Sequence, residues 1–235
     1  GTQTANIIAG GYTGSYINAT ESYDGSSWTT LPATYPQTQA GLTGCGTQTA
    51  GLGFGGETAN DALTATWDGS TWTAVNSMNT GRETAAGFGT QTSAVAAGGS
   101  YPPTNLVEEW DGTNWTAVTA LPSVRRLVVG AGTLTAGLVF GGIGPEPTTI
   151  NLTEEYDGTS WSPGGNLLTP LQGSASSGTQ TSALQMGGST PTASPAATGA
   201  SSQYNGTSWA TTATMAQGRS SGSGSPSGTS TAALQ

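Results

Sequence analysis

The residues that could carry chemistry are few, because the 235-residue chain has 13 acidic residues, four arginines, one cysteine and no histidine or lysine. The most regular candidates are aspartates in the motif aromatic-Asp-Gly-x-x-Trp, namely Asp24, Asp68, Asp111 and Asp157. A ring of such carboxylates could bind calcium, since Ca²⁺ prefers oxygen ligands. Asn205 takes the same place in the last copy of the motif, and the side-chain oxygens of Asp and Asn both cap turns. We therefore predict that these side chains cap their own turns and bind no metal.

Two pairs of neighbouring carboxylates, Glu108-Glu109 and Glu154-Glu155, are the other candidates for acid–base chemistry. Each pair falls in a strand-like segment, where successive side chains point to opposite faces, so its members cannot act together. Without histidine the chain can form neither a Ser-His-Asp triad nor a His-ligated metal site. Cys45 permits no intrachain disulfide, and its place indicates a small buried residue. We predict no catalytic residue, no cofactor and no enzyme, with a glycosidase or lyase as the alternative.

The composition excludes further classes of function. Only 7% of the residues are charged, the formal net charge is −9 and the isoelectric point is about 4.1. Four scattered arginines cannot form the basic surface that binds phosphates, so we expect no nucleic-acid partner. The sequence has no run of about 18 apolar residues, so we expect no membrane insertion. The seven tryptophans indicate a folded chain despite the 38 glycines, since disordered segments are poor in aromatic residues.

An internal repeat positions these residues. The string Gly-Thr-Gln-Thr occurs at Gly1, Gly46, Gly89 and Gly178, and each copy is followed by a short apolar run that ends in Gly-Gly. The chain divides into five repeats, 1–45, 46–88, 89–131, 132–177 and 178–227, and residues 228–235 begin a sixth. Self-similarity at a fixed period is the signature of repeat architectures, and we assign residues 1–235 to a single domain.

Each repeat contains four strand-like segments, which we name a to d in chain order. Strand b alternates large and small residues, which suits sheets that stack face to face. The Asp-Gly between strands c and d predicts a hairpin, because glycine readily adopts a positive φ. Strand a is expected around residues 39–45, 83–88, 127–131, 173–177 and 220–227. Four strands in about 45 residues is the pattern of a β-propeller blade.

The predicted fold is all-β: a five-bladed β-propeller of four-stranded blades, with the ring closed by strands from both termini. Because the chain opens on strand b, strand a of the first blade must come from residues 220–227. Residues 228–235 then repeat a strand that residues 1–11 already supply. They are a frayed end, part of a longer array, a competitor of the N-terminal strand or a strand that pairs with another subunit.

The aromatic residue before Asp-Gly and the tryptophan after it recur at one spacing in all five repeats. These blade residues are Tyr23 and Trp28, Trp67 and Trp72, Trp110 and Trp115, Tyr156 and Trp161, and Tyr204 and Trp209. They could stack sugars, but their presence in every repeat indicates the blade core. Together with the Gly-Gly strand ends, they resemble kelch-type repeats over essentially the whole chain, which implies kelch-like blades. The sequences of the repeated motifs, Gly-Thr-Gln-Thr and Tyr-Asp-Gly-Thr-Ser-Trp, are also similar to those of propellers in bacteriophage head or tail appendages.

The loops of a propeller separate scaffold from variable surface. In a four-stranded blade the a–b and c–d turns lie on one face, and the b–c and d–a loops lie on the other. The turns are nearly constant here and the loops are not, and variable loops on a rigid scaffold often carry binding sites. We place any ligand site on the loop side or across the central opening. The residues of contact-forming types there are Tyr12, Tyr16, Tyr35, Arg82, Tyr101, Arg125 and Arg126.

We expect a non-enzymatic interaction module on an extracellular or virion surface, such as a tail fibre or adhesin. Its predicted role is the recognition of a host receptor or carbohydrate through the variable loops, an inference that the fold alone cannot make. The alternative is a structural subunit of a fibre, filament or capsid decoration, assembled through the propeller and its terminal strand. The expected partners are a cell-surface glycan or receptor, or other virion subunits. The ligand and the oligomeric state are left open.

Overall fold

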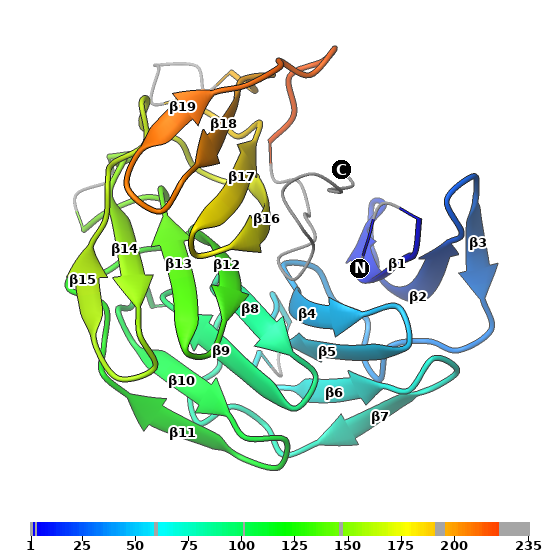
Figure 1. The fold of residues 1–235 in the computed structure, drawn as a ribbon. Coiled ribbons are helices and arrows are strands. Elements are labelled where there is room, and N and C mark those ends of the chain that lie inside the picture. The colour runs from blue at the N-terminus through cyan, green and yellow to red at the C-terminus, as the bar shows by residue number, and fades with distance from the viewer. Residues whose placement is uncertain are drawn as a thin grey trace.

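The computed structural model describes residues 2, 4–58, 61–100, 102–145, 148–190 and 196–220. Within them every regular element is a β-strand, and the strands form five antiparallel sheets around a common centre (Figure 1). This part of the chain contains no helix long and apolar enough to cross a membrane. The fold is a five-bladed β-propeller, as the repeats predict.

The blades are numbered in chain order, and their strands follow one another across each sheet. Blade 1 contains β1 (Asn6–Tyr12), β2 (Tyr16–Tyr23) and β3 (Trp28–Leu31). Blade 2 contains β4 (Thr43–Thr47), β5 (Ala50–Phe54), β6 (Thr64–Trp67) and β7 (Trp72–Val75). Blade 3 contains β8 (Ala86–Thr90), β9 (Ser93–Ala97), β10 (Val107–Trp110) and β11 (Trp115–Val118). Blade 4 contains β12 (Val129–Thr133), β13 (Ala136–Phe140), β14 (Thr153–Tyr156) and β15 (Trp161–Pro163). Blade 5 contains β16 (Ala175–Thr179), β17 (Ser182–Met186), β18 (Ser201–Tyr204) and β19 (Trp209–Thr211).

Blade 1 differs from the others in its strand content. Blades 2 to 5 each have the four predicted strands, whereas blade 1 has three among the described residues. Its innermost strand is predicted from residues 220–227, and all but the first of these lie outside the described residues. The same holds for residues 228–235, so closure of the ring by both termini stays a prediction.

The inner strands begin a few residues later than the sequence suggests. In blade 2 this strand is expected around residues 39–45 and is found at Thr43–Thr47. Gly46 pairs with Gly51 across the a–b hairpin, so the Gly-Thr pair ends strand a and does not begin strand b. Gly46 suits this place because its φ is 102° and a Cβ there would lie 2.3 Å from the carbonyl oxygen of Ala50.

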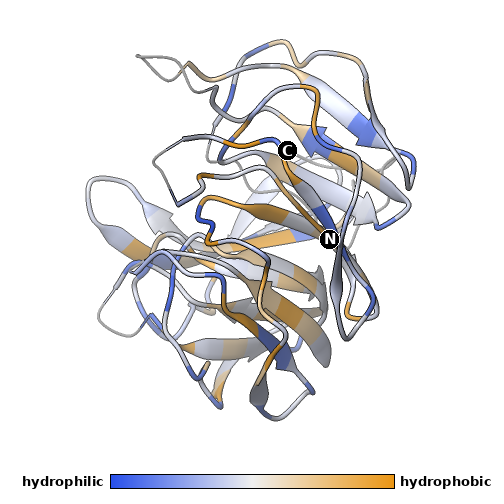
Figure 2. Ribbon diagram, turned by 90° about the vertical axis from the view of Figure 1, so that its left-hand side faces the viewer, coloured by the Kyte–Doolittle hydropathy of each residue, from blue (hydrophilic) through white to orange (hydrophobic). Residues whose placement is uncertain are grey.

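Neighbouring blades pack with the large residues of one sheet against the small residues of the next. Leu52 and Phe54 of β5 lie in one buried cluster with Ala94 and Ala96 of β9. Figure 2 shows that the strands carry most of the apolar residues. The predicted division of strand b into a large face and a small face is therefore what allows the sheets to stack.

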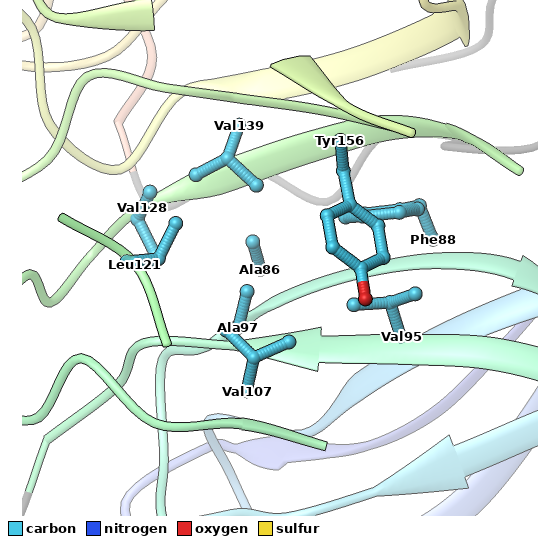
Figure 3. Close-up of a cluster of buried hydrophobic side chains, with 9 residues drawn as sticks. All are labelled: Ala86, Phe88, Val95, Ala97, Val107, Leu121, Val128, Val139 and Tyr156. Atoms are coloured by element: carbon cyan, nitrogen blue, oxygen red, sulfur yellow. The ribbon is translucent and has the colours of Figure 1, made fainter. Parts of the chain in front are cut away.

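The cluster between blades 3 and 4 shows how closely the sheets fit (Figure 3). It consists of Ala86, Phe88, Val95, Ala97, Val107, Leu121, Val128, Val139 and Tyr156. The Phe88 ring fills the place of a missing side chain at Gly137 in β13, where a Cβ would lie 2.3 Å from the ring. A larger residue at this glycine would have to displace the ring, because protein cores are close-packed.

The aromatic residue before Asp-Gly is buried in the core of blades 2 to 5, as predicted, whereas the tryptophan after it is buried in blades 3 and 5 and partly buried in blades 2 and 4. Trp67, Trp110, Tyr156 and Tyr204 are at most 1% exposed. Each lies against the tryptophan of its own hairpin, with ring centroids 4.6 to 5.5 Å apart. In blade 1 Tyr23 and Trp28 pair in the same way, with centroids 5.1 Å apart, but Trp28 is 43% exposed.

The glutamine of Gly-Thr-Gln-Thr joins blades 2, 3 and 5 to the blade before them, a role that the sequence pattern does not reveal. Gln91 Nε2 donates to the carbonyl oxygens of Gly51 and Trp67 in blade 2, at 3.2 and 2.6 Å. Gln180 makes the corresponding bonds to blade 4. Leu134 takes this place in the fourth repeat and packs against the apolar cluster between blades 3 and 4. The polar contact in blades 2, 3 and 5 is thus replaced by an apolar contact in blade 4.

The motif aspartates cap their turns, as predicted. Oδ1 of Asp111 accepts hydrogen bonds from the backbone N–H groups of Thr113 and Asn114, both at 2.7 Å. Asn205 makes the same pair of bonds at 2.9 Å. Backbone N–H bonds are the chief cause that lowers the pKa of the four aspartates, and that of Asp24 falls from 3.8 to about 2. Such bonds favour the charged carboxylate.

We predict that these turns make the fold acid-sensitive. A carboxylate whose pKa is lowered on folding stabilises the fold above its unfolded pKa, and this contribution is lost as the pH falls through the folded pKa. The free energy of unfolding should therefore decrease between about pH 4 and about pH 2. The variant D24N/D68N/D111N/D157N keeps the caps, as Asn205 does, and should show a flatter pH dependence in denaturant titrations. Equal slopes for both proteins would contradict this assignment.

Candidate functional site

The b–c and d–a loops gather at one end of the ring, as predicted. The Gly56 N–H, where a b–c loop begins, donates to the carbonyl oxygen of Arg82 in the next d–a loop at 3.2 Å, and the same contact recurs in the following blades. At the opposite end, Trp67 Nε1 donates to the carbonyl oxygen of Gln48 in the a–b turn at 2.7 Å. We call the end that carries the b–c and d–a loops the loop face.

Two arginines that the sequence places among the ligand contacts are buried in ion pairs. Arg82 Nη2 lies 3.0 Å from Glu108 Oε1, with the two side chains 1% and 2% exposed. Arg125 forms the equivalent pair with Glu154. Burial lowers the pKa of both guanidinium groups, and the partner carboxylates oppose this effect. The structure corrects the expectation for both arginines, because each side chain turns inward to a glutamate on strand c of its own blade.

Tyr35 is also buried rather than exposed on a loop. Its hydroxyl donates to the carbonyl oxygen of Gly53 at 3.1 Å, and its ring meets Trp72 edge to face with centroids 5.1 Å apart. Burial raises the pKa of this phenol. The expectation of a ligand contact is corrected here as well, since Tyr35 fills the interface between blades 1 and 2.

Three of the predicted contact residues do lie on the loop face. Tyr12 is 64% exposed and Tyr16 is 41% exposed, and their rings meet edge to face at 5.5 Å. Arg126 is half-buried. Tyr101 lies outside the described residues. The structure brings the two tyrosines together, whereas Arg126 belongs to a loop two blades further along the chain.

A cavity of about 420 Å³ opens on the loop face beside the tyrosines. Tyr16 lines it from blade 1, Glu57, Thr58 and Asp61 from the b–c loop of blade 2, and Glu83 from the d–a loop before β8. We call it the acidic pocket. No repeated motif marks its three carboxylates, because they belong to the loops that differ between repeats. The sequence signals the pocket in that three acidic residues, in a chain with few charges, fall in two neighbouring loops.

Contacts from the neighbouring blades hold the walls of the acidic pocket. The Glu57 N–H donates to a backbone carbonyl of the preceding d–a loop at 2.9 Å, and the Thr58 hydroxyl donates to Gln39 Oε1 at 3.2 Å. The Asp61 carboxylate packs on Gly81, where a Cβ would lie 1.7 Å from Oδ1. These contacts hold Glu57, Thr58 and Asp61 in place against the neighbouring loops.

The acidic pocket contains features that work against stability. Burial is the first cause that raises the pKa of Glu83, followed by the charges of Glu57 and Asp61, while Arg126 opposes them. The next residue, Thr84, has a φ of 54°, and the equivalent residue Leu127 in the following blade has a φ of 51°, so this backbone conformation belongs to the repeat and not to the pocket alone. A carboxylate whose pKa is raised by burial and by neighbouring like charges is a candidate for a functional site. In the part of the chain that the structure describes, no three acidic or cysteine side chains are grouped to hold a metal ion.

We predict that Glu83→Gln raises the melting temperature at pH 7. The pKa of Glu83 is raised in the folded state, so its ionised form destabilises the fold at neutral pH and the penalty disappears as the pH falls below both its pKa values. The gain should therefore shrink toward zero by about pH 3 in a thermal unfolding series. A lower melting temperature for the variant at pH 7 would show that Glu83 supports the fold.

Comparison with protein-family models gives no match for this chain, and no curated protein matches its sequence. The acidic pocket therefore has to be interpreted from its own chemistry.

Proposed function

We propose that this propeller is a non-enzymatic recognition module that binds a glycan in the acidic pocket. The observation that carries the proposal is the position of the pocket, where unequal loops from neighbouring blades meet on an otherwise repetitive ring. Variable loops on a rigid scaffold commonly bind ligands. A preformed cavity with an aromatic wall and a few polar groups is the usual form of a small-ligand site.

The chemistry of the pocket favours a neutral or amino-bearing glycan. The carboxylates of Glu57, Asp61 and Glu83 accept hydrogen bonds from hydroxyl or ammonium groups. The half-exposed ring of Tyr16 offers an apolar surface to a sugar face or a cation. The formal net charge of −9 works against an anionic glycan.

The location of the protein and the kind of partner it meets there are part of the proposal. The Gly-Gly strand ends and the aromatic–tryptophan spacing resemble kelch-type repeats. The sequences of the repeated motifs are similar to those of propellers in bacteriophage appendages. We infer an extracellular or virion surface, where a host receptor or cell-surface glycan would be the partner.

The binding proposal is tested with immobilised neutral, amino-bearing and acidic glycans. Tyr16→Ala and Glu57→Gln should each weaken binding by about 10-fold or more, which is the effect of losing roughly 1.4 kcal/mol at a central contact. The matched control is Thr116→Ala on the outer strand β11, an exposed position away from the loop face. Binding that survives both pocket variants, or that Thr116→Ala weakens equally, would contradict the proposal.

Glycoside hydrolysis is the second candidate, because three carboxylates share the pocket and Arg126 influences one of them. Glu83, whose pKa is raised, would be the general acid, and Glu57 or Asp61 would be the base or nucleophile. Release of reducing sugar from the bound glycan, abolished by Glu83→Gln, would favour hydrolysis. Recovery of the intact glycan after long incubation would favour simple binding.

A further inference from the structure

The b–c connection of blade 1 differs in shape from those of the other blades. In blades 2 to 5 strand b ends before the Gly-Gly pair, at Phe54, Ala97, Phe140 and Met186. In blade 1 strand b continues through Gly10 and Gly11 to Tyr12, and β2 begins at Tyr16. Two paired strands therefore project beyond the Gly-Gly pair at the loop face, and we call residues 11–17 the tyrosine hairpin.

Backbone hydrogen bonds anchor the base of the tyrosine hairpin to the d–a loop before blade 2. The Gly11 N–H donates to the carbonyl oxygen of Gln39 at 2.7 Å, and the Gln39 N–H donates to that of Ile17 at 2.9 Å. Just below the hairpin, the Tyr35 N–H donates to the carbonyl oxygen of Asn18 at 2.9 Å. Because both strands are held at the base, the side chains at the tip are presented from a fixed backbone.

A tight turn at the tip sets Tyr12 and Tyr16 opposite each other. The two residues are partners in the pairing of β1 with β2, and between them the Thr13 N–H donates to the carbonyl oxygen of Ser15 at 3.1 Å. Gly14 has a φ of 100°, which glycine adopts without a steric penalty. Side chains of directly paired residues lie on the same face of a sheet, so both rings stand on one side of the hairpin.

The two rings serve different parts of the loop face. Tyr16 lines the acidic pocket, whereas Tyr12 lies next to it and is the more exposed of the two. The rings meet edge to face, with their planes inclined by 64°. An apolar sugar face packs flat against one aromatic face, so a single sugar unit cannot lie flat against both rings. Tyr12 therefore provides a separate apolar surface beside the pocket.

A cross-strand pair of aromatic residues also stabilises a hairpin, but that role does not require exposure. Tyr12 is 64% exposed, whereas the aromatic residue before Asp-Gly is buried in blades 2 to 5. Within the described residues, neither tyrosine hydroxyl of the hairpin has a hydrogen-bond partner. Exposed tyrosines are typical of recognition surfaces, because a tyrosine supplies a large contact area at a small cost in conformational entropy.

The tyrosine hairpin is neutral, unlike the acidic pocket. Residues 12–17 read Tyr-Thr-Gly-Ser-Tyr-Ile and include no charged side chain. The pocket beside them is lined by Glu57, Asp61 and Glu83. A sugar unit held against Tyr12 therefore needs an apolar face and no charge, whereas the pocket favours a neutral or amino-bearing unit.

We propose that Tyr12 is a second contact site beside the acidic pocket, and that the propeller binds an oligosaccharide of two or more sugar units in preference to a single sugar. One unit lies in the pocket against Tyr16, and the adjoining unit lies against the exposed ring of Tyr12. This inference rests on the proposed glycan binding. It adds the size of the glycan and the residue that contacts its second unit.

The test measures affinity against the length of the glycan. The probes are the monosaccharide, disaccharide and trisaccharide of β-1,4-linked glucosamine, which bears amines, and of β-1,4-linked glucose, which is neutral. In the series that binds, the disaccharide should bind about 10-fold more tightly than the monosaccharide, as one well-placed aromatic contact provides. Tyr12→Ala should remove this gain and change the affinity for the monosaccharide by less than about twofold, whereas Tyr16→Ala should weaken the binding of both.

Matched variants and salt separate the possible outcomes. Tyr12→Phe keeps the aromatic face and should retain the gain, and Thr116→Ala is the neutral control. The gain should be equal at low and high salt, because screening acts on charges and the tyrosine hairpin has none.

Four results would overturn the inference and leave the proposed function standing. These are equal affinities for the monosaccharide and disaccharide, a gain that survives Tyr12→Ala, an equal loss for both ligands in that variant, and a gain that falls with salt. Binding of no member of either series would count against glycan binding in the pocket and would overturn both proposals.

Discussion

The structure depends on the fact that one blade cannot bury both faces of its own sheet. Each sheet carries large residues on one face and small residues or glycine on the other, so it is stable only when a neighbour covers it. The fit is close: the Phe88 ring occupies the space that a side chain at Gly137 would need. Glutamine clamps, indole–hydroxyl bonds and tyrosine–glutamate bonds then fix the register of adjacent blades. These polar contacts align the sheets, while apolar area supplies most of the driving force.

A ring built from nearest-neighbour contacts leaves its loops free to differ. The a–b and c–d turns are constrained because their capping aspartates and clamping glutamines join strands and blades. The b–c and d–a loops make fewer contacts of this kind, so their sequences can differ. The acidic pocket forms where the loops of successive blades meet. The same loops also lead an arginine into the core of the blade that follows. One loop can therefore present a carboxylate to the pocket and, one residue earlier, place a charge in the interior, as Glu83 and Arg82 do.

The acidic pocket brings like charges together around a partly buried carboxylate. By contrast, Glu108 is matched by an arginine, Glu109 by a tyrosine hydroxyl and Asp111 by backbone N–H groups. At Glu83 burial and neighbouring like charges raise the pKa. This contrast separates the pocket from the other acidic residues and underlies its proposed role in binding.

The sequence by itself determined the repeat, the number of blades, the antiparallel hairpins and the capping role of Asp24 and its equivalents. These features depend on local chemistry: side-chain alternation, Asp-Gly turns and a fixed period. Tertiary structure decided which loop residues face solvent. Tyr35, Arg82 and Arg125 are of residue types that often contact ligands, and they lie in variable loops. Packing between and within blades nevertheless buries them completely. Tertiary structure also brought together Tyr16, Asp61 and Glu83, which are far apart in the chain and share no motif. Their proximity depends on the angle between adjacent sheets, and no local pattern encodes that angle.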